Sequence, residues 1–387
     1  MAVLRSTVWG WSGLRTVNKT SSIVVVGAGI VGCAVAYELA RRGMHVRVLD
    51  RREVGQGATQ ASAGVLAPFI EAFDRRKLLD LTSRSLGLYD EFVSRVVEDS
   101  GAAIQYARTG TLEVALDDAG LNRLKAIQKT CEERGIRAEL LKHRELFSAE
   151  PHLSKSISGG LIVESHGFVG ATDLTNALRR AAGAYGVSFE TASAATRIAK
   201  NGSGIRIETA GDNFVCDTVV MAAGSWSSRV EIDGTTPIPI RPVRGQLIHL
   251  GWPSPALTRV IWSPSCYLVP WSDGTVLVGA TVEEVGFDER ATVAGVRSLI
   301  DSTQIVAPEV SEASFLEARV GLRPATPDEL PVIGPSSVFP GLVYACGHFR
   351  NGILLAPLTA SLIGDFLVDQ TQDEVLDLTT PSRFGDC

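Results

Sequence analysis

The pattern of apolar and polar positions predicts a β-α-β unit near the start of the chain. Residues 23–26 form a short, continuous and β-branched apolar run, which is typical of a strand buried on both faces. A helical pattern over 33–42 follows and ends at Gly43, and an alternating strand over 45–49 then ends at Asp50. A β-α-β unit takes about 30 residues, and these segments together have that span.

Beyond this unit the pattern predicts mixed helices and strands, then a strand-rich stretch, then a return to mixed structure. The first mixed group comprises an amphipathic helix over 74–98, a strand over 111–116, helices over 117–134 and 172–185, and a strand over 217–223. The strand-rich stretch comprises strands over 246–250, 267–270 and 276–278, and one helix over 292–306. The final group is a strand over 342–345 and a helix over 352–368.

This order predicts an α/β fold in which a Rossmann-like nucleotide domain is interleaved with a β-rich α+β substrate domain. We assign the nucleotide domain to residues 22–105, 160–232 and 318–370, and the substrate domain to residues 106–159 and 233–317. The remaining residues, predicted to be tails, are 1–21 and 371–387. The first 20 residues lack a continuous apolar stretch, so we read them as an extension, or alternatively a transit-like segment, rather than a secretory signal.

Composition narrows the class of protein. The chain has 387 residues, of which 45% are hydrophobic, and its net charge of −6 is mildly acidic. The apolar content argues against a disordered chain, the length suggests two domains, and the acidity disfavours binding to nucleic acid. The apolar stretch 352–368 is interrupted by Pro357 and Asp365, so no membrane span is expected.

The cysteines and histidines form no recognisable metal or redox motif. The six cysteines stand at scattered positions, no two of them in a CxxC spacing, and the six histidines are equally dispersed. Scattered thiols in a chain of this length indicate reduced cysteines, so we expect a cytoplasmic protein without a resident metal.

The segment that joins the first strand to the first helix carries a dinucleotide-binding fingerprint. Residues 27–32 read Gly-Ala-Gly-Ile-Val-Gly, which matches GxGxxG between a buried strand and a helix, with Asp50 closing the next strand. Gly27 allows a tight turn, Gly29 lets the backbone approach a pyrophosphate, and Gly32 lets helix and strand pack closely. The helix N-terminus then faces the anion, and Asp50 accepts a hydrogen bond from a ribose hydroxyl. Glycines that serve only a βα turn are the alternative.

Two features favour FAD over NAD as the nucleotide. Only one fingerprint occurs, so no second site for a nicotinamide nucleotide is visible. The segment 57–66, which follows the second strand, is dense in small residues and suits a backbone that runs close to a flat ring.

Several motifs together resemble those of the D-amino-acid oxidase superfamily of FAD-dependent oxidoreductases. They are the fingerprint, Thr-Gln-Ala-Ser-Ala-Gly-Val-Leu-Ala-Pro at 59–68, Ala-Ala-Gly-Ser-Trp at 222–226, Cys-Tyr-Leu-Val-Pro at 266–270, Arg-Val-Gly-Leu-Arg-Pro at 319–324, and the segment 345–357 that contains Gly-His-Phe-Arg-Asn-Gly. The last three are most similar to the glycine oxidase branch, which serves thiamine biosynthesis. The resemblance covers residues 22 to 368.

The resemblance implies a GR2-type FAD-binding domain and a set of cofactor-binding residues. These are Gly27, Gly29, Ile30, Val31, Gly32, Asp50, Arg51, Ala58, Thr59, Ala63, Gly64, Val65, Ala195, His348, Phe349, Arg350, Asn351, Gly352, Ile353 and Leu354. Sarcosine oxidases attach flavin through a cysteine where this chain has Gly321, so the resemblance implies that the FAD is bound non-covalently. The turn over 347–352 offers backbone N–H groups and a helix dipole, which would stabilise negative charge at N1 and O2 of a reduced flavin. An ordinary turn before a core helix is the alternative.

The same resemblance implies catalytic roles for Tyr267, Arg323 and Arg350. An arginine among apolar and proline neighbours is either paired with a protein carboxylate or free to bind a ligand carboxylate, and the family places Arg323 as the bidentate clamp. Tyr267 begins an apolar strand, where a tyrosine is usually core, but the family places its hydroxyl on the substrate carboxylate. Arg350 is expected near the flavin and the mouth of the site.

Other positions bear on the substrate. The family lines its small substrate pocket at the positions of Ala67, Ile70 and Val282. Ser265 stands where glycine oxidases often have a histidine, and Leu277 stands where sarcosine oxidases have the lysine that activates oxygen. These departures leave glycine, sarcosine and small D-amino acids open as substrates.

The activity that the resemblance implies is FAD-dependent oxidative deamination of a small amino acid or amine. A hydride passes from Cα to flavin N5, the imine hydrolyses to an oxo acid and ammonia, and O2 reoxidises the flavin to give hydrogen peroxide. The imine from glycine would supply thiamine thiazole synthesis, and a homotetramer is expected. One alternative is a dehydrogenase of D-amino acids or sarcosine that passes electrons to a quinone or carrier. The other is a flavin-bearing binding protein without turnover.

Overall fold

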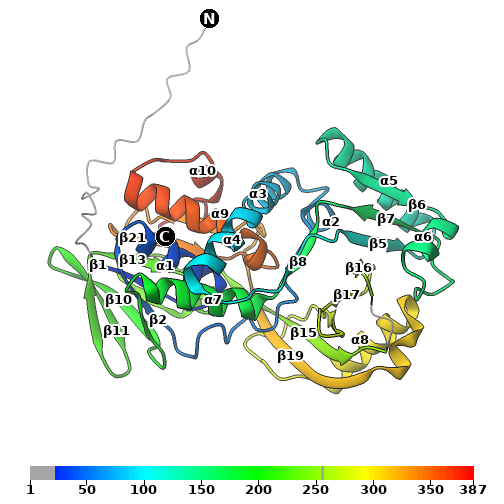
Figure 1. Ribbon diagram of the computed structural model, residues 1–387. Coiled ribbons are helices and arrows are strands. Elements are labelled where there is room, and N and C mark those ends of the chain that lie inside the picture. The colour runs from blue at the N-terminus through cyan, green and yellow to red at the C-terminus, as the bar shows by residue number, and fades with distance from the viewer. Residues whose placement is uncertain (1–21, 254–256) are drawn as a thin grey trace, which may run out of the picture.

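The computed structural model describes residues 22–253 and 257–387, and these build two lobes, each around a large β-sheet (Figure 1). The predicted N-terminal extension lies outside the described residues, within positions 1–21. One lobe contains the nucleotide fingerprint, and the other contains the strand-rich region.

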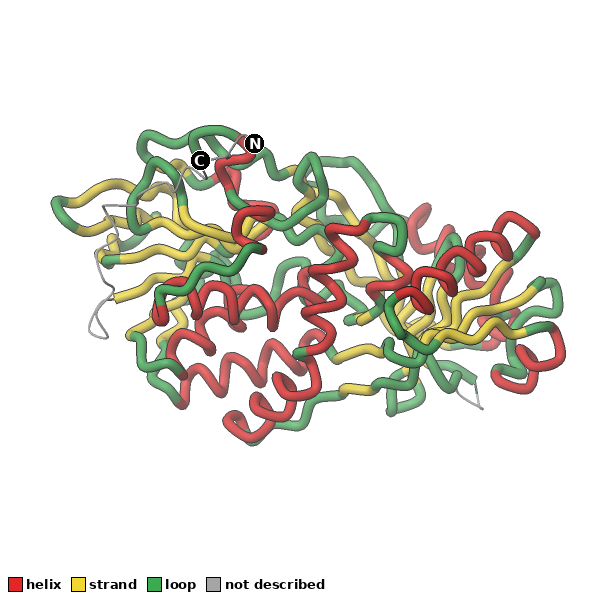
Figure 2. Tube along the Cα trace, turned by 90° about the horizontal axis from the view of Figure 1, so that it is seen from above, coloured by secondary structure: helices red, strands yellow, loops and turns green. Residues whose placement is uncertain are grey.

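The first lobe is built on a six-stranded sheet in the order β20-β21-β13-β1-β2-β9, parallel except for β20. Its strands are β1 Ser22–Val26, β2 His45–Leu49, β9 Ser188–Glu190, β13 Thr218–Met221, β20 Val332–Pro335 and β21 Leu342–Cys346. Helices gather on one side of these strands (Figure 2). They are α1 Ile30–Arg41, α3 Arg76–Gly87, α4 Tyr89–Ser100, α7 Ala171–Ala184 and α9 Gly352–Gly364.

The first strand contributes to two hydrophobic cores. Ile23 and Val25 of β1 pack with the helices, whereas Val24 and Val26 face a four-stranded sheet on the other side. That sheet has the order β12-β11-β10-β14 and consists of β10 Ala195–Asn201, β11 Gly204–Thr209, β12 Asn213–Cys216 and β14 Glu231–Ile232. The prediction of a strand buried on both faces is therefore confirmed.

The second lobe is built on an eight-stranded sheet in the order β19-β15-β18-β17-β16-β5-β7-β6. Its strands are β5 Thr111–Ala115, β6 Ala138–Leu141, β7 Gly159–Val163, β15 Arg241–Gly251, β16 Val260–Trp262, β17 Tyr267–Pro270, β18 Thr275–Gly279 and β19 Ser314–Ala325. Its helices are α5 Asp118–Glu133, α6 His143–Ala149 and α8 Val293–Val306. Because β7 pairs with β5 and β6, and β19 pairs with β15, residues 160–163 and 318–325 go with the substrate domain in the division that we propose.

Between the lobes lie a small sheet and a short helix. The sheet has the order β3-β8-β4 and consists of β3 Val65–Leu66, β4 Tyr106–Ala107 and β8 Gly167–Val169. Helix α2, Pro68–Glu71, follows β3 directly. The chain thus passes from the fingerprint lobe to the second lobe through residues that also border the site described below.

Where the apolar pattern predicts one helix over 74–98, the structure has two. Helix α3 ends at Gly87 and α4 begins at Tyr89, with Leu88 as the break between them. Glycine is a poor helix former, so the chain can change direction there. The Tyr89 hydroxyl then donates to the carbonyl of Ile353 at 2.5 Å, which fixes α4 against the start of α9.

The C-terminal segment 371–387, predicted to be a tail, packs onto the first lobe. Helix α10, Val375–Thr379, joins the helical core of that lobe. Arg383 donates to the Asp328 carboxylate at 2.9 Å and to the carbonyl of Leu330 at 2.9 Å. The segment is therefore part of the folded lobe, although few of its residues are apolar enough to indicate this.

A long strand ties the two lobes together. Strand β19 pairs with β15 along its length, and at its end Ala325 forms a bridge with His348. The N–H of Phe349 also donates to the carbonyl of Pro324 at 2.9 Å. The end of the eight-stranded sheet is thus hydrogen-bonded to the turn that precedes α9.

One stretch of helix, Gly352–Asp369, is long and apolar enough by length and composition to cross a membrane. It comprises α9 and the π-helical turn Asp365–Asp369. In the structure 67% of this stretch is buried inside the protein, as a core helix would be.

Candidate active site

A cavity of about 700 Å³ lies where the two lobes meet. The fingerprint, the small-residue segment, the 222–226 strand end and the turn before α9 border it from the first lobe. The second lobe contributes residues 262–267 and 321–324. The motifs quoted for the resemblance, which are far apart in sequence, therefore converge on one cavity.

Two fingerprint positions have no room for a side chain. A Cβ at Gly27, where φ is +113°, would lie 2.3 Å from the carbonyl oxygen of Ala222. A Cβ at Gly32 would lie 1.9 Å from the carbonyl oxygen of Gly27. These contacts give the first and third glycines the turn and packing roles that the fingerprint predicts.

Asp50 is held by the backbone beside the fingerprint. One carboxylate oxygen accepts the N–H of Ala28 at 2.6 Å, and the other accepts the N–H of Arg52 at 2.8 Å. Burial raises the pKa of Asp50, and these two hydrogen bonds oppose the increase. Each oxygen can accept a second hydrogen bond, and Asp50 lines the cavity, so a ribose hydroxyl can be bound there.

The small-residue segment approaches other backbone closely, as its composition predicts. The hydroxyl of Thr59 accepts the N–H of Ile30 at 3.1 Å, which ties this segment to the N-terminus of α1. A Cβ at Gly321 would lie 2.8 Å from Cβ of Ala61 and 3.0 Å from Cα of Ala58. Position 321 therefore has no space for a cysteine side chain, which supports the proposal of a non-covalent cofactor.

The turn before α9 has the backbone geometry that its glycine indicates. Gly347 has φ of +71°, and Phe349 also adopts a left-handed conformation. Burial lowers the pKa of His348 to about 3, so its ring is neutral, and its Nε2 lies 3.0 Å from the Thr359 hydroxyl. Gly352 and Ile353, in the first turn of α9, line the cavity next to this turn.

These observations fit FAD as the bound group, with a nucleotide end at the fingerprint and a ring end near β19. Most of the cofactor residues predicted from the resemblance line the cavity. Three of them do not line it: Gly32, Asn351 and Leu354.

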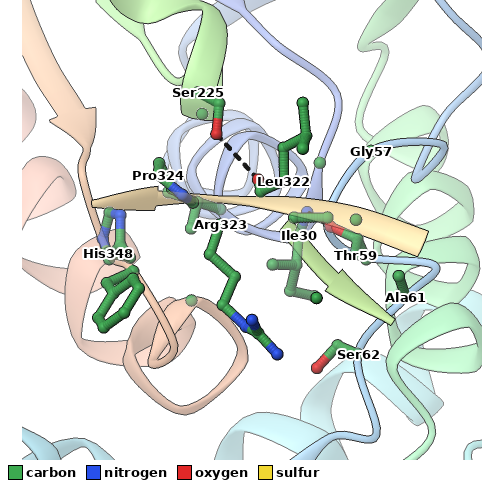
Figure 3. Close-up of a pocket in the computed structure, with 18 of the residues that line it drawn as sticks. Ile30, Gly57, Thr59, Ala61, Ser62, Ser225, Leu322, Arg323, Pro324 and His348 are labelled. Carbon is green, nitrogen blue, oxygen red and sulfur yellow. Dashed lines mark hydrogen bonds between the residues drawn. The ribbon is translucent and has the colours of Figure 1, made fainter. Parts of the chain in front are cut away.

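Arg323 projects from β19 into the open centre of the cavity (Figure 3). Its Nη1 donates to the carbonyl of Thr281 at 2.9 Å and more weakly to that of Arg244 at 3.4 Å. Within the described ranges it has no ion pair with a carboxylate, and burial lowers its pKa. A guanidinium that bonds to carbonyls and to the Tyr267 hydroxyl, and to no carboxylate, retains N–H groups for an anionic ligand.

Tyr267 lies beside Arg323 at the same end of the cavity. It is the first residue of β17 and stacks on Trp262 with ring centroids 5.1 Å apart. Burial raises its pKa to about 12, so its hydroxyl keeps its proton near neutral pH and can donate a hydrogen bond. Its partner across the strand pair, Gly279, leaves space for that hydroxyl, since a Cβ there would lie 2.4 Å from it.

Gly245 offers a direct test of the arginine's placement. A Cβ at this position would lie 2.3 to 2.4 Å from guanidinium atoms of Arg323. We expect Gly245→Ala to fold and bind flavin, because a flexible guanidinium can shift, but to raise the KM for a carboxylate substrate about tenfold. Gly251→Ala on the same strand meets its nearest neighbour at 3.5 Å and serves as the control. An unchanged KM in Gly245→Ala would contradict the placement.

The remaining predicted positions divide into two groups. Arg350 and Val282 line the cavity, as does Ser265, whereas Ala67 and Ile70 are buried and do not line it.

Sequence reasoning missed two parts of the site. Glu71, at the end of α2, lines the cavity near Arg350 and Arg323. At the nucleotide end, Trp226 lies under the guanidinium groups of Arg51 and Arg52, at 4.9 and 4.8 Å from its ring centroid. Trp226 belongs to the motif at 222–226, which could have indicated it. No local sequence pattern distinguishes Glu71 from the other glutamates of the chain.

Comparisons with known proteins agree with this site. A family model described as FAD dependent oxidoreductase matches residues 22–366. The glycine oxidase of Geobacillus kaustophilus is 30% identical over 347 residues, which cover 89% of this chain and 92% of that protein. Its crystal structure matches with a TM-score of 0.87, over 92% of this chain and 96% of that one.

Two further relatives have names other than glycine oxidase. The bifunctional protein ThiO/ThiG of Synechocystis sp. is 32% identical over 375 residues, which cover 95% of this chain but 54% of that protein, so this chain spans about half its length. The hydrogen cyanide synthase subunit HcnC of Pseudomonas aeruginosa is 30% identical over 393 residues, covering 92% of this chain and 94% of that one. The chain therefore belongs to the FAD-dependent oxidoreductase family, and its cofactor is FAD.

Proposed function

We propose that this enzyme oxidises the amino group of a small amino acid such as glycine or sarcosine. The observation that carries the proposal is the buried guanidinium of Arg323, which has no carboxylate partner in the described part of the chain and points into the cavity. A ligand carboxylate would supply the missing negative charge. The glycine oxidase relatives, about 30% identical, support an amino acid as that ligand.

In this proposal the chain's own residues position the substrate. Arg323 holds the carboxylate through paired N–H groups, and the Tyr267 hydroxyl donates a further hydrogen bond to it. Arg350, which also lines the cavity, adds positive charge near the entrance. With its carboxylate fixed, a small amino acid has few ways to orient its Cα–H bond, and this restriction supplies much of the rate.

When bound, FAD supplies the acceptor for the hydride from Cα and passes the electrons on to oxygen. The turn over 347–352 and the N-terminus of α9 favour negative charge on a group that lies against them. The ring of His348 is neutral, so the favourable charge at this turn comes from backbone N–H groups and the helix dipole. The substrate leaves as an imine, and water converts it to an oxo acid and ammonia.

The product, compartment and assembly are further proposals. We propose that the imine from glycine supplies thiamine thiazole synthesis, which the ThiO/ThiG relatives support. The cysteines in the described residues are free and buried, in keeping with a cytoplasmic protein. A homotetramer rests on the resemblance alone, and light scattering on the purified protein would measure it.

An anaerobic screen tests the proposal directly. The purified flavoprotein is mixed with glycine, sarcosine, N-ethylglycine and D-alanine, and loss of the flavin absorbance is followed. We expect at least one of them to bleach the flavin, and hydrogen peroxide to form in equal amount once air is admitted. A flavin that no amino acid bleaches would contradict the proposal, whereas bleaching without peroxide would indicate a carrier rather than O2 as acceptor.

A further inference from the structure

We propose that Glu71 binds the amino group of the substrate and accepts a proton from its ammonium form. This inference rests on the proposed function and deepens it, because it assigns the group that faces the amine of that substrate. Glu71 is the last residue of α2, and its side chain lines the cavity near Tyr267, Arg323 and Arg350.

The carboxylate of Glu71 is available to a ligand. It has no hydrogen bond and no ion pair with any residue in the ranges 22–253 and 257–387, and its side chain is half-buried beside the cavity. A carboxylate in such a place loses hydration that no protein donor replaces. Glu71 is therefore available to a ligand amine, just as Arg323 is available to a ligand carboxylate.

Several other polar groups that line the cavity are already engaged. The hydroxyl of Ser263 donates to the carbonyl of Cys266 at 2.8 Å, and the ring of His348 is bonded to a threonine hydroxyl. Asp50, which also lines the cavity, accepts two backbone N–H groups beside the fingerprint. Glu71 is thus the carboxylate at the substrate end that can receive an ammonium group.

The charges at this end suit both the carboxylate and the ammonium group of an amino acid. Arg323 and Arg350 bring two positive charges and Glu71 brings one negative charge, a net charge of +1 (two minus one). Tyr267 is neutral, since its pKa is about 12. The two arginines outweigh the one carboxylate, which favours a ligand whose own carboxylate is negative.

Near neutral pH, however, an amino acid arrives as a zwitterion with an ammonium group. In the transfer to Glu71 one N–H bond of the ammonium breaks, an O–H bond forms on the carboxylate, and the electron pair of the broken bond stays on nitrogen. That lone pair then forms the C=N bond of an iminium ion as the hydride leaves Cα, and the iminium loses a proton to water to give the imine. After the imine departs, water takes the proton from Glu71.

The surroundings of Glu71 suit this exchange. Burial raises its pKa, and the charges of Arg350, Arg323 and Arg75, in that order, oppose the increase. Arg350 belongs to the turn before α9, Arg323 to β19, and Arg75 to the segment before α3, where it is bonded to Glu329. The transfer therefore needs a pH above the raised pKa of Glu71, and above the pKa of the free amine the base is no longer required.

The test follows anaerobic flavin reduction by glycine and sarcosine from about pH 6 to about pH 9 in wild type and Glu71→Gln, around the pKa values of such groups. In the wild type the rate should level off above the pKa of Glu71. In Glu71→Gln it should rise about tenfold per pH unit, because the neutral fraction of the free amine rises by that factor below its pKa. A Glu71→Gln profile that matches the wild type overturns the proposal.

Two measurements separate proton transfer from a structural effect. Glu132→Gln, an exposed glutamate on α5, should leave the pH profile unchanged. Glu71→Ala should regain reduction when formate is added, because a small carboxylate can occupy the vacated space and accept the proton. Flavin content of each variant reports folding, and failure of formate to rescue a variant with full flavin content counts against the proposal.

A binding comparison tests Glu71 without turnover. α-Aminoisobutyrate has no Cα–H to lose, and 2-hydroxyisobutyrate differs from it only in the amino group. Glu71→Gln should weaken the first about tenfold or more and the second less than about twofold, measured by their effect on the flavin spectrum. Equal losses would contradict the assignment to the amine. If no amino acid reduces the flavin of the wild type, the proposed function fails. If amino acids reduce it but Glu71→Gln weakens both ligands equally, only the Glu71 assignment fails.

Discussion

An Arg323→Ala variant should reduce its flavin with the amino-acid substrate about 10²- to 10⁴-fold less efficiently than the wild type, measured as kcat/KM. The substitution removes one partner of a buried, charge-assisted contact, which costs about 3–5 kcal/mol, and each 1.36 kcal/mol is about a factor of ten. The loss should fall on carboxylate ligands in general, so binding of an unreactive carboxylate should weaken as well.

Two variants accompany this measurement. Arg323→Lys keeps the charge but not the paired N–H groups, so it should recover only part of the lost efficiency. Arg319→Ala is the matched control, because Arg319 lies on the same strand, pairs with Glu317 at 2.6 Å and does not line the cavity. An Arg323→Ala enzyme that bleaches as readily as the wild type would show that the clamp lies elsewhere.

Gly64→Ala should prevent the accumulation of folded flavoprotein. Gly64 has φ of +67°, and a Cβ there would lie 1.8 Å from the carbonyl oxygen of Val169. Because that atom is backbone in the paired strand β8, the clash can be relieved only by separating β3 from β8. We expect a loss of about 4 kcal/mol or more in the free energy of unfolding, a large part of the stability of a typical domain. Thermal unfolding and bound-flavin fluorescence would measure it.

Substitutions at two other glycines separate the cost of a positive φ from the cost of the steric clash. Gly43 has φ of +87° but nothing within 4 Å of an added Cβ, so Gly43→Ala should cost only about 1–2 kcal/mol. Gly57 has neither a positive φ nor a close neighbour, so Gly57→Ala should change stability little. If Gly64→Ala is no worse than Gly43→Ala, the contact with Val169 does not limit this position.

The sequence was most informative where local geometry leaves few choices. The GxGxxG turn, Asp50 after the next strand and the glycine turn before α9 each require particular backbone shapes, and the structure has all three. The helix pattern over 74–98 failed at Leu88 because periodicity continues across a break that leaves both helices facing the same core. Strands β10 to β12 were missed because their exposed, mixed side chains give a weak alternation.

Glu71 was missed for a different reason. Its role depends on three charged or polar side chains from other elements, and only the tertiary fold brings them together. Helix α2 has four residues, too few for a helical pattern to define a face. Arg323 was identified through its motif, but the absence of a carboxylate partner among the described residues, which leaves it available to a ligand, is visible only in the structure.

The hydrogen bonds between β19 and the turn before α9 have a consequence for selectivity. They join the strand that carries Arg323 to the segment bordering the flavin, so both belong to one rigid unit. A hinge motion of the lobes elsewhere would leave the separation between Arg323 and this turn unchanged. If Arg323 binds the substrate carboxylate, the site selects by the number of atoms between carboxylate and reacting carbon, and we predict that it excludes β-amino acids whatever the size of their side chains.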